Sequence, residues 1–327
     1  MKPLHIAIVG ATGLVGRKFL TVIDHYQIPI SELSLFASKK SRGKMITFRD
    51  EKYFVKTIED GSFKGVDVAL FSAGSTVSKQ YAPQAVREGA LVIDNSSAWR
   101  MDSDVPLVVP EVNIKDAIGK RLIANPNCST IQCMYPLHIL QQHYGIVDID
   151  YHTYQAVSGA GIKGIEDLKD DQVSYFPYDI KETVIPHIDD FLSDGYTKEE
   201  HKMMNETRKI LNDPKLNVSA TCVRVPVETG HAVSLKVTLK EDVDIKALRE
   251  TLKKYEHLIV FDDPEKLRYP TTIQAKNRDV MFVGRLRKDL NDPKKVLMFI
   301  TADNIRKGAA TNAVQIMRCI VDESYTM

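Results

Sequence analysis

The chain has 327 residues, of which 43% are hydrophobic and 27% are charged, and its formal net charge is +1. This length predicts two domains, and the composition is typical of a soluble globular protein. The charge balance and the lack of a long apolar run argue against nucleic-acid and membrane partners. The N-terminus lacks a leader pattern, and the four cysteines fit neither a disulfide framework nor a zinc site. We therefore expect a cytoplasmic protein with no bound metal.

A glycine-rich loop follows the first apolar run. Leu4–Val9 is typical of a buried parallel strand, and an amphipathic helical pattern runs from Leu14 to Ile23. The glycines at positions 10, 13 and 16 form a G-x-x-G-x-x-G loop. The first two lie between the strand and the helix, and the third lies inside the helical pattern. Strand, loop and helix in this order predict a dinucleotide site, with a plain strand-to-helix turn as the alternative. The expected cofactor contacts in this loop are Gly10, Ala11, Thr12, Gly13, Leu14 and Val15.

Further short apolar runs alternate with helical stretches such as Ser75–Glu88, which predicts a Rossmann-type, doubly wound parallel sheet. These runs are Leu33–Ala37, Val66–Phe71, Leu91–Ile93, Leu107–Val109 and Leu122–Ala124. The segment after the second strand contains Ser38 and Arg42 and no carboxylate. It favours the 2′-phosphate of NADP over NAD, although a solvated basic loop remains the alternative. A second, less specific cofactor contact is expected at the end of a later strand, at Ser72, Ala73 and Gly74.

The segment Asn125-Pro126-Asn127-Cys128-Ser129-Thr130-Ile131-Gln132 places a cysteine between a strand end and a helix start. Backbone N–H groups and the helix dipole favour the thiolate there, and a thiolate attacks acyl carbons. A small buried cysteine is the alternative. The helix is expected to run to about Tyr144, with Pro136 as an unexplained interior break.

Two features of the next segment favour a pocket. Asp148–Ala156 predicts a strand that leads into a glycine-bracketed turn and presents Gln155, with a simple strand-to-helix turn as the alternative. Thr197-Lys198-Glu199-Glu200 is a capping-box pattern that predicts a helix start. That helix carries Glu199, Lys202 and Glu206 on one face, which by default is an exposed ladder of ion pairs.

A pair of strands is predicted farther along the chain. One begins near Val218 and reaches Arg224, and His231 follows at the exit of a turn. The strict apolar–polar alternation of Val233–Leu239 is typical of an antiparallel sheet with one exposed face. Arg224 and His231 would then lie at the ends of neighbouring strands of a possible hairpin, although a lone histidine is more often structural. These features predict a second, α+β domain with a mainly antiparallel sheet.

Taken together, four motifs resemble the aspartate-β-semialdehyde dehydrogenase family over essentially the whole chain. They are the Gly10–Gly16 loop, the Asn-Pro-Asn-Cys-Ser-Thr run at 125–130, Tyr-Gln-Ala-Val-Ser-Gly-Ala-Gly at 154–161, and Arg224–His231. The resemblance implies NADPH-dependent reductive dephosphorylation of L-4-aspartyl phosphate to L-aspartate 4-semialdehyde through a cysteine thioacyl intermediate. Its place would be the aspartate pathway to lysine and diaminopimelate, threonine, methionine and isoleucine.

The resemblance also implies a domain plan and an assembly. Residues 1–127 with 305–327 would form the NADP-binding domain, because the last helix resembles one that returns to it. Residues 128–304 would form the catalytic and dimerisation domain. The expected assembly is a homodimer or a dimer of dimers.

Each matching position receives a role from the resemblance. Cys128 would be the nucleophile, His231 the general acid/base and Gln155 a residue that orients the acyl group. Arg224 would bind the substrate α-carboxylate, and Glu199 the amino group, with Glu200 as a competitor. The remaining implied contacts are Arg100 and Lys202 for phosphate, Asn127 beside the acyl group, and Ser158, Gly159 and Asn312 for the cofactor.

One position departs from the family pattern. The family commonly continues its histidine as His-Ser-Glu, whereas this chain reads His231-Ala232-Val233-Ser234. The missing carboxylate removes a local partner of the imidazolium, which would lower the histidine pKa or shift the pH optimum. Two other functions stay open: a related acyl-phosphate reductase such as N-acetylglutamyl-phosphate reductase, expected to have glycine in place of Asn127, and a non-enzymatic NADP-binding regulator.

Overall fold

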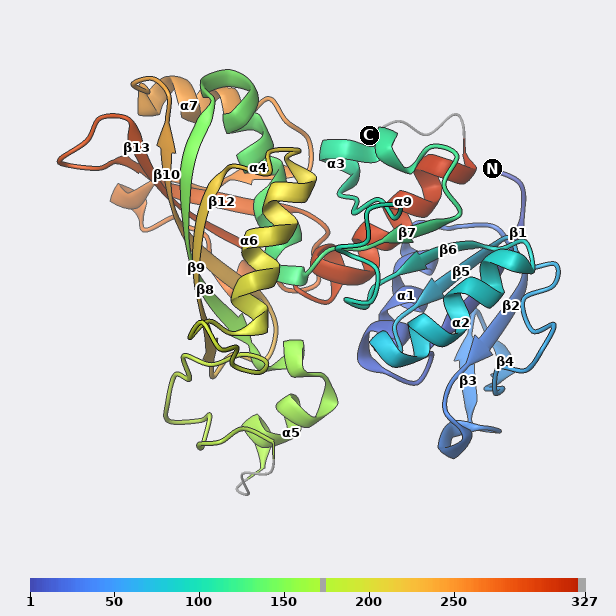
Figure 1. Cartoon of the computed structure of the whole chain (residues 1–327). Coiled ribbons are helices and arrows are strands. Elements are labelled where there is room, and N and C mark those ends of the chain that lie inside the picture. The colour runs from blue at the N-terminus through green and yellow to red at the C-terminus, as the bar shows by residue number, and fades with distance from the viewer. Residues whose placement is uncertain (171–174, 323–327) are drawn as a thin grey trace. The chain divides into compact units, whose positions relative to one another are not determined.

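The computed structural model describes residues 1–170 and 175–322. The chain divides into two compact units (Figure 1). Unit 1 comprises Met1–Pro126 and Ala309–Met327, and unit 2 comprises Asn127–Gly308. In the described part of the chain, every helix is too short or too polar to cross a membrane.

Unit 1 contains a five-stranded parallel sheet in the order β2-β1-β5-β6-β7, which confirms the predicted Rossmann-type sheet. Its strands are β1 (Leu4–Val9), β2 (Ile30–Phe36), β5 (Val68–Phe71), β6 (Leu91–Asp94) and β7 (Leu122–Ala124). The strand predicted at Leu107–Val109 is wrong, because only an isolated bridge joins Leu107 to Ala124. Pro106 and Pro110 flank this segment, and proline limits the ladder on either side of it. An unpredicted hairpin, β3 (Met45–Phe48) with β4 (Glu51–Phe54), lies beside β2.

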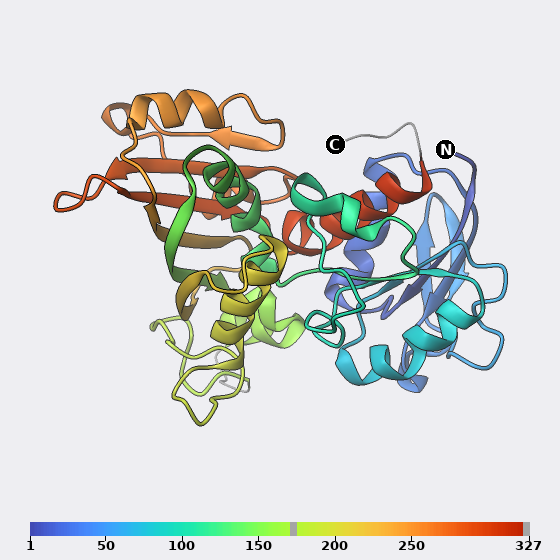
Figure 2. The same cartoon turned by 45° about the horizontal axis from the view of Figure 1, so that its top comes forward.

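Alternating side chains of the unit 1 strands supply two apolar cores. In β1, Ile6 and Ile8 point to one face of the sheet, whereas Ala7 and Val9 point to the other. Helices α1 (Leu14–His25) and α9 (Asn312–Val321) cover the first face. Helix α2 (Ser75–Arg87) covers the second face, as the two views show (Figures 1 and 2). The short helix α3 (Pro110–Asn113) contacts α9.

Unit 2 contains a six-stranded mixed sheet in the order β11-β12-β13-β10-β8-β9. Its strands are β8 (Ile146–Ala156), β9 (Asn217–Val225), β10 (His231–Leu239), β11 (Leu258–Val260), β12 (Met281–Lys288) and β13 (Lys295–Ala302). The central strands β12, β13, β10 and β8 are antiparallel, and β9 and β11 are parallel to their neighbours. The predicted mainly antiparallel sheet is thereby confirmed.

The predicted hairpin between the Arg224 and His231 strands is wrong, because β8 lies between β9 and β10. The connection 226–230 crosses the end of β8. It is held there by hydrogen bonds from the Val157 N–H to the Val227 carbonyl and from the Ser158 N–H to the Glu228 carbonyl. The end of β9 and the start of β10 therefore both lie beside the residues that follow β8.

The sheet of unit 2 is accompanied by the helices α4 (Cys128–Tyr144), α5 (Ile162–Lys169), α6 (Lys198–Ile210), α7 (Ile245–Leu252) and α8 (Thr272–Ala275). Helices α4 and α6 contact each other and pack on the sheet, α4 against β8, β10 and β13, and α6 against β9 (Figure 1). Helix α4 has the predicted bounds, with Pro136 buried inside it. The capping box of α6 at Thr197 and Glu200 is confirmed.

Candidate active site

Cys128 and His231 are in contact in unit 2. The Cys128 Sγ lies 3.2 Å from the His231 Nε2. Cys128 is the first residue of α4, and the Asn127 side chain caps this helix by accepting from the N–H groups of Ser129 (2.8 Å) and Thr130 (3.4 Å). His231 begins β10, so a helix start and a strand start bring the two side chains together.

The His231 ring has a defined tautomer in this arrangement. Its Nδ1 accepts a hydrogen bond of 2.9 Å from the Ala156 backbone N–H. In a neutral imidazole the proton must then reside on Nε2, which donates to Cys128 Sγ. Burial, followed by the positive charge of Arg224, lowers the pKa of His231 to about 3. The backbone amide thus orients the ring, the task that a carboxylate after the histidine would otherwise perform.

Arg224 presents a buried guanidinium beside this pair. The residue is 5% exposed, and its Nη1 donates to the Ala156 carbonyl at 2.7 Å. Its Nε has no hydrogen-bond partner among the described residues. Burial lowers the pKa of Arg224. A Cβ at Gly159 would lie 2.8 Å from the Arg224 Nη1, so a side chain here would displace the guanidinium from this position.

Glu199 is the centre of a buried hydrogen-bond network. Its Oε1 accepts from the side-chain amides of Asn127 (2.8 Å) and Gln155 (3.0 Å), and its Oε2 accepts from Lys202 Nζ (3.1 Å). Burial alone would raise the pKa of Glu199, but Lys202 and the two amides hold it at about 2. The carboxylate is therefore ionised and faces the residues that the sequence grouped as substrate contacts.

Glu200 points to a different task. Its Oε2 accepts from the Thr197 N–H at 2.7 Å, and its Oε1 accepts from the Cys222 N–H at 3.1 Å. Both oxygens are occupied by backbone donors, one of them in the capping box. Among the two glutamates, Glu199 is the one that contacts the Asn127–Gln155 network.

The exposed-ladder interpretation of the α6 face is wrong. Glu199 is 5% exposed and Glu206 is 1% exposed, because α6 packs on β9 and α4. The Glu206 Oε2 accepts from the Asn127 N–H at 2.6 Å. Lys202 is bonded to Glu199 and, at 2.6 Å, to the Oδ2 of Asp189.

Sequence reasoning missed three supporting residues of unit 2, namely Asp189, Glu206 and Asn304. The Asn304 side chain donates to the Ser158 Oγ (3.0 Å) and accepts from the Gly230 N–H (2.8 Å), which ties together the turns after β8 and β9. Glu206 had a usable signal, because it shares a helix face with Glu199. Asp189 and Asn304 lie in segments without any periodic pattern.

The glycine-rich loop of unit 1 has the geometry of a phosphate cradle. A Cβ at Gly10 would lie 2.3 Å from the Ser72 carbonyl oxygen, and a Cβ at Gly16 would lie 2.1 Å from the Gly10 carbonyl oxygen. The loop thus approaches the strand end closely at Ser72 and Ala73. Helix α1 begins with no side-chain cap at Gly13, so its first N–H groups have no side-chain acceptor at the cap. These residues fit a dinucleotide pyrophosphate.

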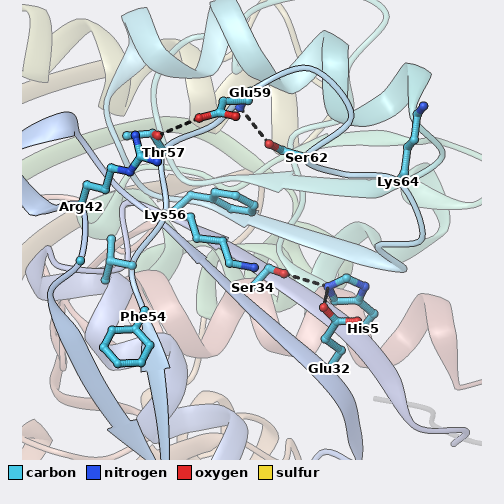
Figure 3. Close-up of a pocket in the computed structure, with 13 residues that line it drawn as sticks. His5, Glu32, Ser34, Arg42, Phe54, Lys56, Thr57, Glu59, Ser62 and Lys64 are labelled. Atoms are coloured by element: carbon cyan, nitrogen blue, oxygen red, sulfur yellow. Dashed lines mark hydrogen bonds and ion pairs between the residues drawn. The ribbon is translucent and has the colours of Figure 1, made fainter.

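The Ser38–Arg42 segment lies next to this loop. The N–H groups of Gly10 and Ala11 donate to the Phe36 carbonyl, and the Thr12 Oγ1 lies 3.4 Å from the Ser41 Oγ. Arg42 lines a pocket of about 550 Å³. In Figure 3, Arg42, Thr57 and Glu59 lie at one end of this pocket and His5, Glu32 and Ser34 at the other. The pocket also contains the cations Lys56 and Lys64.

Arg100 and Asn312 belong to unit 1, as do the loop residues above. The Arg100 Nε and Nη2 donate to the carbonyls of Asn125 (3.0 Å) and Asn95 (2.9 Å). The buried Asn312 amide donates to the Val108 carbonyl and to the Asn125 Oδ1. Both side chains therefore bind the segment that precedes Cys128. Clusters of three or more metal-ligating side chains are absent from residues 1–170 and 175–322.

Two family models match the chain. The model described as "Semialdehyde dehydrogenase, NAD binding domain" matches residues 5–120. The model described as "Semialdehyde dehydrogenase, dimerisation domain" matches residues 137–307. Between them they span most of both units.

Relatives match at nearly full length. The chain is 51% identical to an aspartate-semialdehyde dehydrogenase of Aquifex aeolicus, covering 97% of this chain and 98% of the relative. It is 45% identical to one of Campylobacter jejuni, covering 96% of each. Among solved structures, aspartate semialdehyde dehydrogenase II of Vibrio cholerae complexed with ASA has a TM-score of 0.95 at 40% identity, covering 99% of this chain and 100% of that one. The enzyme with NADP from Candida albicans has a TM-score of 0.78 at 25% identity, covering 97% and 98%.

These matches agree with the geometry of both units, and the chain belongs to the aspartate-semialdehyde dehydrogenase family.

Proposed function

We propose that the chain catalyses the NADPH-dependent reductive dephosphorylation of L-4-aspartyl phosphate to L-aspartate 4-semialdehyde and phosphate. The observation that carries this proposal is the 3.2 Å contact between Cys128 Sγ and the Nε2 of a buried, neutral His231. Beside the pair lie a guanidinium with an unused donor, Arg224, and an ionised carboxylate, Glu199. Together these groups complement an amino acid whose side chain carries an acyl phosphate.

The substrate's polar groups have complementary partners. The planar fork of Arg224 binds the α-carboxylate, since a guanidinium offers two donors in the geometry that a carboxylate accepts. Glu199 faces the α-ammonium, and its charge is maintained by Asn127 and Gln155. Lys202 takes the phosphate, and Arg100 of unit 1 is assigned the same ligand.

The covalent step begins at Cys128. Its thiolate attacks the acyl carbon, phosphate leaves with the electron pair of the broken C–O bond, and a thioacyl enzyme results. The N–H groups of Ser129 and Thr130, in the first turn of α4, already donate to the Asn127 side chain. His231 Nε2–H, 3.2 Å from Sγ, donates a hydrogen bond that stabilises the thiolate and the developing oxyanion, and the carbonyl re-forms as phosphate leaves.

NADPH supplies the hydride when it is bound. The Gly10–Val15 loop and the start of α1 hold its pyrophosphate, with Ser72, Ala73 and Gly74 as the adjoining strand end. Ser38 and Arg42, in the segment after β2, hold the 2′-phosphate. Ser158, Gly159 and Asn312 are assigned to the nicotinamide side. After hydride transfer, collapse of the thiohemiacetal releases the semialdehyde and returns the thiolate.

A homodimer through unit 2 is the proposed assembly, with a dimer of dimers as its extension. Residues 128–304 would act as the catalytic and dimerisation domain, and 1–127 with 305–327 as the NADP-binding domain. Tyr154, 41% exposed, and Phe299 form a ring pair on the sheet of unit 2, with centroids 6.2 Å apart. Such an aromatic pair suits a partner surface. The proposed setting is the cytoplasmic aspartate pathway to lysine and diaminopimelate, threonine, methionine and isoleucine.

The reverse reaction tests the proposal. L-aspartate 4-semialdehyde, inorganic phosphate and NADP⁺ are expected to give phosphate-dependent formation of NADPH, measured by absorbance. N-acetylglutamate semialdehyde and NAD⁺ serve as control substrates. Activity with the acetylglutamyl substrate alone would assign the chain to that sister reaction, and silence with both, from protein that binds NADP⁺, would leave a non-enzymatic binder.

A further inference from the structure

The lysine assigned to phosphate is already bonded to two carboxylates. Lys202 Nζ lies 3.1 Å from the Glu199 Oε2 and 2.6 Å from the Asp189 Oδ2. Two carboxylates and one ammonium leave a net charge of −1 around this atom. A phosphate group that carries more than one negative charge would be repelled by such a site. One carboxylate must therefore leave when phosphate binds.

The surroundings identify Asp189 as the one that leaves. Glu199 has a side chain that is 6% exposed, and Asn127 and Gln155 hold its other oxygen. The Asp189 side chain is 34% exposed, and within the described part of the chain its other oxygen accepts only from the neighbouring Asp190 N–H at 2.9 Å. Asp189 also lies in the left-handed region, with φ of +66°, in the segment between helices α5 and α6.

We propose that Asp189 is an internal competitor for Lys202, which the phosphate of the substrate displaces. This rests on the proposed function, since it requires Lys202 to bind phosphate. The Asp189 carboxylate holds the lysine in place before substrate arrives. It thereby sets the phosphate concentration that is needed to displace Asp189 from Lys202. Asp189 is thus a specificity-determining residue for the phosphate and not for the aspartyl part of the substrate.

The neighbouring residue supplies a matched control. Asp190 Oδ2 lies 2.6 Å from the Nζ of Lys198, one helical turn before Lys202 on α6. Asp190→Asn therefore removes the same charge from the same segment, at a carboxylate that is bonded to Lys198 and acts on Lys202 only through longer-range charge. Asparagine at 189 also tolerates the left-handed backbone, so Asp189→Asn retains the local fold.

The experiment measures steady-state KM for inorganic phosphate and, separately, for L-aspartate 4-semialdehyde in the reverse reaction at low ionic strength. Asp189→Asn is expected to lower the phosphate KM by about two- to fivefold, the range of an exposed ion pair. The semialdehyde KM should stay unchanged, and Asp190→Asn should lower the phosphate KM by less than Asp189→Asn does, because Asp190 is bonded to Lys198 instead. Added salt should shrink the difference between Asp189→Asn and the parent enzyme.

A third variant distinguishes failure of the Asp189 inference from failure of the assignment of Lys202 to phosphate. Lys202→Gln should raise the phosphate KM, and the effect of Asp189→Asn should vanish in the double variant. If Lys202→Gln raises the phosphate KM but Asp189→Asn raises it too or leaves it unchanged, Asp189 does not compete and only the present inference fails. If Lys202→Gln leaves the phosphate KM unchanged, the assignment of Lys202 to phosphate fails and the inference fails with it.

Discussion

The Cys128–His231 contact determines which chemistry each side chain performs. Because His231 Nδ1 accepts from a backbone N–H, a second proton on the ring would point at another donor hydrogen. The imidazolium is disfavoured, and the thiolate is stabilised by the start of α4 and by Nε2–H instead of by an ion pair. We infer that the histidine acts as a neutral hydrogen-bond donor while the thiolate attacks.

Substitution of the nucleophile tests the covalent step. Cys128→Ser is expected to abolish turnover, because a serine hydroxyl in this position remains protonated. Binding of NADP⁺, measured by fluorescence titration, should stay within a factor of about two of the parent enzyme. Cys133→Ser is the control, since Cys133 is fully buried on the same helix. Near-normal activity of Cys128→Ser would rule out a thioacyl intermediate.

Arg224 allows a test of the carboxylate clamp. Arg224→Lys keeps the charge but loses the planar fork, so the KM for L-aspartate 4-semialdehyde should rise by roughly 10- to 100-fold. The phosphate KM should change far less. Arg208→Lys is a suitable control, because Arg208, like Arg224, donates to a backbone carbonyl in the same unit, in its case from Nε to Leu216. An unchanged semialdehyde KM in Arg224→Lys would contradict the proposed binding of the α-carboxylate by Arg224.

The buried histidine also predicts how stability depends on pH. Its folded pKa of about 3 lies below the ordinary value of 6.5, so the unfolded chain binds a proton that the folded chain excludes. Stability should fall as pH drops from 6.5 towards 3, by about 1.4 kcal/mol per pH unit from this group. Urea unfolding at pH 7.5 and pH 5.0 should show a smaller loss for His231→Gln. An equal loss in both proteins would mean that His231 does not exclude the proton.

Residue roles were predictable from the sequence where a side chain stands inside a local pattern. Cys128 follows a strand and starts a helix, so its exposure to the helix dipole could be inferred. The second partner of Lys202 could not, because Asp189 is 13 residues away in a segment without periodicity. The orienting partner of His231 is a backbone N–H, which no residue type can signal.

At the scale of elements, the glycine loop of unit 1 is defined by what surrounds it. Gly10→Ala is expected to weaken NADP⁺ binding by about 10-fold or more, because a Cβ there would meet the Ser72 carbonyl oxygen at 2.3 Å. Gly89→Ala is the control, since Gly89 also has a positive φ but has no atom within 4 Å of the added Cβ. Equal losses of binding in the two variants would assign the effect to backbone strain alone.

Element types were easier to predict than their neighbours. The alternation of Val233–Leu239 identified a half-buried strand, and its buried and half-buried residues alternate as expected. The same pattern contains nothing about which strand lies beside it. The sequence pattern therefore predicts a hairpin, whereas in the structure β8 separates β9 and β10. Pairing depends on the path of the connection 226–230, whose hydrogen bonds are to residues some 70 positions earlier.

At the scale of the whole molecule, unit 1 is built from both ends of the chain. The core on one face of its sheet combines Leu4–Val9 with residues of α9, among them Ala313 and Met317. Met317→Ala should lower the free energy of unfolding by about 2–4 kcal/mol, because it empties a fully buried position. Ile320→Ala, at a partly buried position, should cost less. Thermal unfolding monitored by circular dichroism distinguishes the two, and equal costs would contradict the assigned burial.

The late position of α9 has a consequence for biosynthesis. A ribosome completes all of unit 2 before it adds the residues from Ala309 onwards that close the core of unit 1. The nascent N-terminal segment must therefore wait, with one apolar face of its sheet only partly covered, while almost the entire chain is made. A premature stop near the C-terminus would leave an intact sequence for the thiol chemistry and an N-terminal half exposed to chaperones and proteases.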